Sequence, residues 1–223
     1  MTELTNLGGY HVDLVMCIDK TGSMYSLING VKETAKTFCD QFKEAMKNSQ
    51  KIVTKFRVKV IAFGDYGCNA KPMVESEFFE LDDQKGEYIN FVNGLEAEGG
   101  GDDAENAYEA IALAFKSDWV RTGGVRRHVT MVFTDAPALP FSARREEPLY
   151  PSDMPEDLAE LQEIWESQEM ETRAKRLILL TPDDSTWTEM GMWNNTFQYH
   201  SAAGIGTTAT NMDEILRLLV KSV

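Results

Sequence analysis

The stretch Val12–Ser26, VDLVMCIDKTGSMYS, decides how the rest of the chain folds. Its first part is an almost continuous apolar run that ends on an acid, Asp19. Such a run predicts a strand buried on both faces, as in the parallel sheets of α/β proteins. From Ile28 to Met46, apolar residues then recur every three or four positions. This spacing predicts an amphipathic helix, so the stretch opens an α/β sheet.

Three oxygen-bearing side chains, Asp19, Thr21 and Ser23, occupy alternate positions after this strand. They lie in a strand-to-helix loop at the carboxyl end of the strand, where open α/β sheets bind their ligands. Mg²⁺ takes about six oxygen ligands, several of them water, and usually one or two carboxylates. One carboxylate and two hydroxyls suit that ion. The alternative is that Thr21 and Ser23 only cap the next helix, and the loop alone leaves both interpretations open.

Two later segments also place acids at the edge of a predicted sheet. A glycine-rich segment, Gly99–Ala107, contains Asp102 and Asp103 just before a helical pattern. A later buried strand, Val125–Thr134, is followed directly by Asp135. Glycines let the backbone approach a ligand closely, although the two adjacent acids are equally suited to capping the helix that follows.

The loop Asp19-Lys20-Thr21-Gly22-Ser23 resembles the D-x-S/T-x-S signature of the von Willebrand factor A (VWA) domain. In that family, a metal-ion-dependent adhesion site holds Mg²⁺ or a similar divalent ion. The glycine-rich segment and Asp135 match the family's second and third loops, in the family's order. The resemblance implies a site for Mg²⁺ or Mn²⁺ that is formed by five side chains: Asp19, Thr21, Ser23, Asp102 and Asp135. Asp103 is the less favoured alternative to Asp102.

The second loop departs from the adhesion pattern, because Asp102 stands where integrin-type domains carry a threonine. This loop and the tripeptide Asp135-Ala136-Pro137 are similar to a bacterial, kinase-associated branch of the family. The resemblance implies a metal-dependent protein-binding module in an intracellular regulatory or scaffold protein. Its metal would engage an acidic group of a protein partner, such as a kinase or phosphatase.

The alternative function is a metal-dependent hydrolase or phosphatase that uses the same carboxylates. A haloacid-dehalogenase-type phosphatase needs a second Asp two residues after its nucleophile, where this chain has Thr21. The chain also lacks a G-x-x-x-x-G-K-[ST] phosphate loop and a nucleophile elbow. We therefore expect a binding module rather than an enzyme.

Composition restricts the partners and the compartment. The net charge of −14 disfavours nucleic acid as a partner, because phosphate binding needs clustered cations. No apolar run approaches the roughly 20 residues that span a bilayer, and the first residues lack the layout of a secretory signal. The three cysteines form no C-x-x-C pair, so reduced thiols and a cytoplasmic location are expected.

We expect a single domain over residues 1–223, with a short tail at 1–10. The expected fold is a doubly wound, mostly parallel sheet of six strands, with helices on both faces. Five strands are predicted from apolar runs, and the resemblance implies that Met73–Leu81 is an antiparallel edge strand. The five are 12–18, Phe56–Phe63, Val125–Thr134, Arg176–Leu180 and Phe197–His200.

A proline-rich insertion at 136–155 directly follows the third predicted metal loop, and five of the seven prolines lie there. Connections of this length are uncommon inside a domain. The insertion is either part of a rim that selects a partner or a stiffened segment packed on the surface, and both interpretations stay open. Asp65, after the second strand, either shapes a turn or points toward the metal loops, and the turn is favoured.

Overall fold

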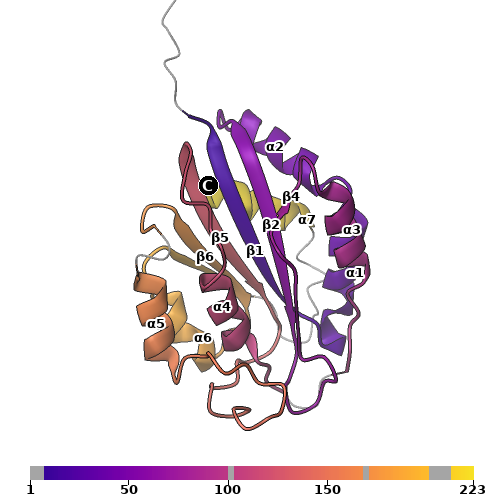
Figure 1. Cartoon of the computed structure of the whole chain (residues 1–223), viewed down its shortest axis with the longest axis vertical. Coiled ribbons are helices and arrows are strands. Elements are labelled where there is room, and N and C mark those ends of the chain that lie inside the picture. Colours follow the sequence, from indigo (N-terminus) through magenta and orange to yellow (C-terminus); the bar gives the residue numbers. More distant parts are fainter. Residues whose placement is uncertain (1–7, 100–102, 168–170, 201–211) are drawn as a thin grey trace, which may run out of the picture.

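The computed structural model describes residues 8–99, 103–167, 171–200 and 212–223 (Figure 1). Its middle layer is a seven-stranded sheet with the strand order β3-β2-β1-β5-β6-β7. The remaining strand, β4, also pairs with β2. Five strands are mutually parallel, which confirms the predicted α/β fold: β1 (Tyr10–Asp19), β2 (Val53–Phe63), β5 (Val125–Phe133), β6 (Lys175–Thr181) and β7 (Thr196–His200).

Helices cover both faces of the sheet, as a doubly wound fold requires (Figure 1). On one face lie α1 (Tyr25–Thr34), α2 (Phe38–Asn48), α3 (Lys85–Asn93) and α7 (Met212–Ser222). On the other lie α4 (Ala107–Phe115), α5 (Leu158–Glu166) and α6 (Ser185–Gly191). Alternate residues of β1 enter the two hydrophobic cores, Leu14 and Met16 on one side and Val15 and Cys17 on the other. The strand is therefore buried on both faces, as its apolar run predicts.

The antiparallel edge is divided into two short strands, β3 (Met73–Glu75) and β4 (Phe79–Glu80), which both pair with β2. Ser76 interrupts the predicted single strand. Its backbone N–H donates to the Val60 carbonyl at 2.9 Å, and its side-chain oxygen accepts from the Val60 N–H at 3.0 Å. A side chain thus takes the place of a backbone acceptor.

The predicted helix from Ile28 to Met46 is also divided, between α1 and α2. At the end of α1, the Thr34 hydroxyl donates to the Gly30 carbonyl at 2.8 Å, and the Thr37 N–H donates to the Thr34 carbonyl at 2.9 Å. Threonine hydroxyls that bond back to the preceding turn weaken and bend helices. The apolar spacing continues through this break, so periodicity alone did not reveal it.

The order of the strands positions the predicted metal loops. β1 lies between β2 and β5, so the chain turns to one side of β1 and later crosses to the other. Asp19 ends β1, and Asp135 follows the end of β5, its parallel neighbour. Such a switch in strand order leaves a crevice at the carboxyl ends of the strands. The loops after β1 and β5 therefore meet at one edge of the sheet, at the lower end in Figure 1.

Candidate functional site

Asp19 is the buried centre of the candidate site, and both of its carboxylate oxygens accept hydrogen bonds. Oδ1 accepts from the Thr21 backbone N–H at 2.8 Å and from the Thr21 hydroxyl at 2.7 Å. Oδ2 accepts from the Thr134 hydroxyl at 2.7 Å. These bonds fix the carboxylate in one orientation at the end of β1.

The Thr21 and Ser23 hydroxyls lie beside this carboxylate, 3.5 Å apart. Ser23 Oγ donates to Asp135 Oδ1 at 2.8 Å, which joins the first loop to the third. Because each hydroxyl gives its hydrogen to a carboxylate, its oxygen lone pairs remain for another partner. The loop continues into a short 3₁₀ helix, Gly22–Met24, whose N-cap residue is Thr21. Neither Thr21 nor Met24, the N-cap of α1, makes a side-chain capping hydrogen bond, which differs from the capping interpretation of this loop.

An open pocket of about 340 Å³ lies over these groups. Seven residues from all three loops line it: Thr21, Gly22, Ser23, Asp103, Glu105, Asp135 and Ala136. The three loops that the sequence linked are therefore next to one another in space. Asp102, the favoured ligand from the second loop, lies outside the described residues, whereas Asp103, the less favoured one, faces the pocket.

Negative charge accumulates at this site. Burial raises the pKa of Asp19 to about 6, the hydrogen bonds from Thr21 and Thr134 oppose that rise, and the nearby Asp135 adds to it. In the described part of the chain, neither Asp19 nor Asp135 forms an ion pair with a lysine or arginine. A cation would therefore gain favourable interactions with both carboxylates.

The groups that could bind a hard cation here are hydroxyls together with a few carboxylates, rather than a cluster of carboxylates. Among the described residues, no three His, Cys, Asp or Glu side chains come close enough to share a metal ion. Two ligands at right angles on Mg²⁺ lie about 3.0 Å apart, given bonds of about 2.1 Å. The measured Thr21–Ser23 and Ser23–Asp135 oxygen separations, 3.5 and 2.8 Å, are close to that value. The oxygens present thus fit Mg²⁺ or Mn²⁺, which accept this ligand type.

Thr134 is a site residue that no sequence motif marks. Its hydroxyl donates to Asp19 Oδ2 and accepts from the Ala136 backbone N–H at 3.0 Å, so it joins the first loop to the third. As the last residue of a predicted strand, it looked like any other β-branched position. The only available signal was its place next to Asp135.

Glu105 anchors the far end of the second loop. It is buried, lines the pocket, and pairs through its backbone with the third loop: its N–H donates to the Pro137 carbonyl, and its carbonyl accepts from Leu139. The second and third loops are therefore bonded to each other immediately beside the pocket.

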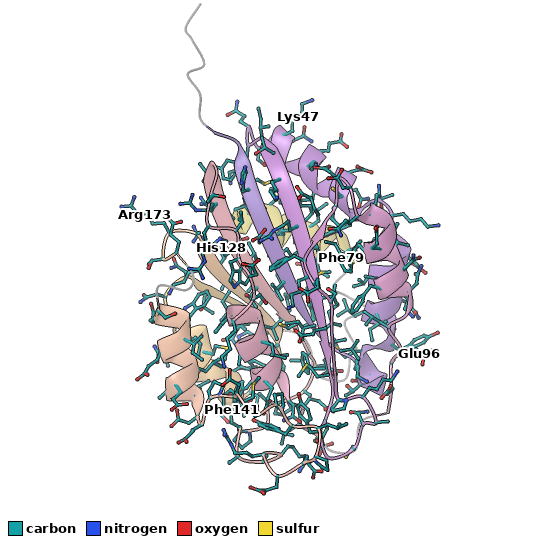
Figure 2. The ribbon with its side chains drawn as sticks, viewed as in Figure 1. Lys47, Phe79, Glu96, His128, Phe141 and Arg173 are labelled. Carbon is teal, nitrogen blue, oxygen red and sulfur yellow. The ribbon has the colours of Figure 1, made fainter. Side chains whose placement is uncertain are left out.

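The proline-rich insertion is packed against the domain. Phe141 is buried in the core under α4, near the site end of the molecule in Figure 2. Arg144 forms a bidentate pair with the buried Asp65, Nε to Oδ1 at 2.6 Å and Nη2 to Oδ2 at 2.8 Å. The Tyr150 hydroxyl donates to Glu109 at 2.8 Å. Asp65 also accepts from the Gly67 N–H, so it shapes its turn, as favoured.

Comparison with known proteins identifies the family. The family model described as the von Willebrand factor A domain matches residues 13–146, more than half of the chain. The chain belongs to the von Willebrand factor A family. VWA domains are protein-interaction and adhesion modules, which agrees with the binding role expected from the sequence. No curated protein sequence matches this VWA chain.

Solved structures share the VWA chain's fold at low sequence identity. A von Willebrand factor type A protein from Catenulispora acidiphila is 14% identical with a TM-score of 0.54, and the match covers 96% of this chain and 43% of that one. The pilus adhesin SpaC from Lactobacillus rhamnosus GG, in an open conformation, is 14% identical with a TM-score of 0.53, covering 95% and 30%. The VWA chain thus spans less than half the length of either protein.

No helix of the described residues is both long enough and apolar enough to cross a bilayer. The charged residues that line the pocket are all acidic: Asp103, Glu105 and Asp135. The pocket therefore favours a cation as its direct ligand.

Proposed function

We propose that this VWA domain binds Mg²⁺ or Mn²⁺ at the pocket and uses the ion to engage an acidic group of a protein partner. Asp19, Thr21, Ser23 and Asp135 are the proposed ligands from the first and third loops. Asp102 is the proposed ligand from the second, with Asp103 as the less favoured choice. The bound ion would supply an open coordination position for a carboxylate of the partner.

One observation carries this proposal. The hydroxyls of Thr21 and Ser23 both donate to carboxylates, and their oxygens lie within 3.5 Å of each other beneath an open pocket. A loop that served only as a turn would not need two hydroxyl oxygens side by side at the floor of a pocket. Among the described residues, Asp19 and Asp135 form no ion pair, so a bound cation would add favourable electrostatic interactions with both carboxylates.

The first test measures binding of the metal alone. Titration calorimetry with MgCl₂ and MnCl₂ should give one site in the wild type and none in Asp19→Ala or Asp135→Ala. Asp183→Ala is the matched control, because Asp183 also follows a strand at this edge but is largely exposed and does not line the pocket. Wild-type protein without measurable binding would refute the proposal.

The second test addresses the partner. Peptides selected on the protein in Mg²⁺ should contain an acidic residue, and their binding should be lost after Glu→Gln replacement or on addition of a chelator. Peptides that bind equally well after both changes would contradict the role of the metal. Mg²⁺-dependent hydrolysis of a simple phosphomonoester, abolished by Asp19→Ala, would instead support the alternative of a hydrolase.

We also propose that the protein works in a cytoplasmic regulatory or scaffold assembly, with a kinase or phosphatase as partner. The similarity of the second and third loops to the bacterial, kinase-associated branch supports this role. Cys17 and Cys39 are buried as free thiols, which suits a reducing compartment. Copurification of such an enzyme that is lost on chelation and in Asp19→Ala is the expected result.

A further inference from the structure

Lys20 has an unusual environment for a lysine in a candidate metal loop. It lies between Asp19 and Thr21, but its side chain is only 3% exposed. Its Nζ pairs with Glu98 Oε2 at 2.9 Å, just before the glycine-rich second loop. Lysines are rarely buried unless paired, so this pair is a specific feature of the site.

The backbone strengthens the same connection. The Glu98 N–H donates to the Lys20 carbonyl at 2.8 Å, and Thr21 and Glu98 form a parallel bridge. The Lys20 N–H in turn donates to the Phe63 carbonyl at the end of β2. Glu98 is therefore bound to the first loop through both its main chain and its side chain.

Asn69 holds the same segment from the other side. Its Nδ2 donates to the Gly99 carbonyl at 3.2 Å and lies 3.4 Å from Glu98 Oε2, while its Oδ1 accepts from the Asp65 N–H at 2.8 Å. A Cβ at Gly64 would come within 2.4 Å of Asn69 Oδ1, so glycine is needed there to admit this side chain. Asn69 thus ties the turn after β2 to the start of the second loop.

We propose that Lys20 and Asn69 are positioning residues that set the affinity of the metal site, an inference that rests on the proposed function. They hold Glu98 and Gly99 against the first loop, and the backbone bonds of Glu105 hold the other end of the second loop. Lys20 lies between Asp19 and Thr21 in the chain, so its pair with Glu98 holds the loop that carries these two proposed ligands. Asn69 in turn holds Glu98 in the position that makes this pair. Residues that orient the ligands from outside typically change metal affinity by about 10–100-fold.

The direction in which metal affinity changes in Lys20→Met distinguishes a positioning role from a purely electrostatic one. Lys20 places a positive charge next to a proposed cation site, so its charge alone opposes metal binding. If charge dominated, Lys20→Met would bind metal more tightly. If Lys20 acts by holding Glu98, the same substitution weakens metal binding. Asn69→Ala removes the second anchor without any change of charge.

The test measures Mn²⁺ affinity by titration with electron paramagnetic resonance in folded wild type, Lys20→Met and Asn69→Ala. Both variants should bind Mn²⁺ about 10-fold more weakly, the lower end of the effect of losing an outer-shell partner. Lys175→Met is the matched control, because Lys175 is also buried and pairs with a glutamate of similar exposure: 0% and 38% against 3% and 35% for Lys20 and Glu98. Its pair lies at the amino end of β6, away from the pocket.

Lys175→Met should lose stability without losing Mn²⁺ affinity. Equal or tighter Mn²⁺ binding by Lys20→Met would overturn the positioning role, and if that variant does not fold, unchanged binding by Asn69→Ala overturns it. A similar loss of affinity in Lys175→Met would show a general effect of stability and would also overturn it. Wild type that binds no Mn²⁺ would refute the proposed function itself.

Discussion

Replacing Arg144 by methionine should release the proline-rich insertion from the domain at a measurable cost in stability. The Arg144 guanidinium makes two charge-assisted hydrogen bonds to Asp65, whose side chain is fully buried. Methionine keeps the apolar stem but removes both donors. The substitution therefore leaves a buried carboxylate without its cationic partner.

The magnitude follows from the surroundings of that carboxylate. Removing one partner of a buried ion pair typically costs about 3–5 kcal/mol. Asp65 still accepts from the Gly67 N–H at 2.7 Å, and Arg144 is 20% exposed, so the cost should lie at the lower end. We expect a loss of about 3 kcal/mol in the free energy of unfolding, or roughly 6–12 °C in Tm.

The loss should depend on pH. The Arg144 guanidinium holds the pKa of Asp65 below its ordinary value. A carboxyl group whose pKa is lower in the folded than in the unfolded protein stabilises the fold at pH values above the unfolded pKa, near 3.9. This contribution disappears as the pH falls through the pKa of the folded protein. The difference in unfolding free energy between wild type and Arg144→Met should therefore be largest at neutral pH and shrink in acid.

Urea unfolding followed by far-UV circular dichroism, at pH 7 and near pH 3, measures this difference. Arg217→Met is the control, because Arg217 pairs with Glu214 at the surface and should lose less than about 1 kcal/mol. A loss below about 1 kcal/mol for Arg144→Met at pH 7, or a loss just as large in acid, would refute the role assigned to the pair.

Three further predictions concern the insertion, the site and the thiols. Phe141→Ala should lower the free energy of unfolding by urea by about 3–5 kcal/mol, because Phe141 is buried. Leu149→Ala, at an exposed position of the same insertion, should lower it by under about 0.5 kcal/mol. Equal losses in the two variants would contradict the packing of the insertion against the domain. Thr134→Val should weaken Mn²⁺ binding about 10-fold by freeing the Asp19 carboxylate, and unchanged affinity would show that Thr134 does not position it. One thiol, that of Cys68, should react with Ellman's reagent in the folded protein; reaction of two or three would show that the cores open readily.

The local pattern of the sequence determined the first strand, the loop after it and the class of the fold. An apolar run ending on Asp19 predicts a buried parallel strand because only a strand covered on both faces tolerates such continuous hydrophobicity. The order of the three loops carried the family resemblance, and the family match over residues 13–146 confirmed it. These inferences succeeded because each motif is formed by residues close together in the chain, and the order of the motifs can be seen in the sequence.

Competing hydrogen bonds determined where elements were interrupted, and the apolar pattern does not record them. The Thr34 hydroxyl bonds back to Gly30 at the end of α1, and Ser76 replaces a backbone acceptor between β3 and β4. In both places the hydrophobic spacing continues across the break. A side-chain oxygen that satisfies a backbone donor or weakens a helical turn overrides periodicity at that point.

Only the tertiary structure decided which distant side chains meet. Thr134 bonds to Asp19 across 115 positions, Arg144 to Asp65 across 79, and Lys20 pairs with Glu98. No local pattern marks these partners, because the strand order β2-β1-β5 alone brings their loops to one edge of the sheet. The sequence by itself determined which oxygens are available, and the fold decided how they are oriented and held, since orientation depends on hydrogen bonds between segments far apart in the chain.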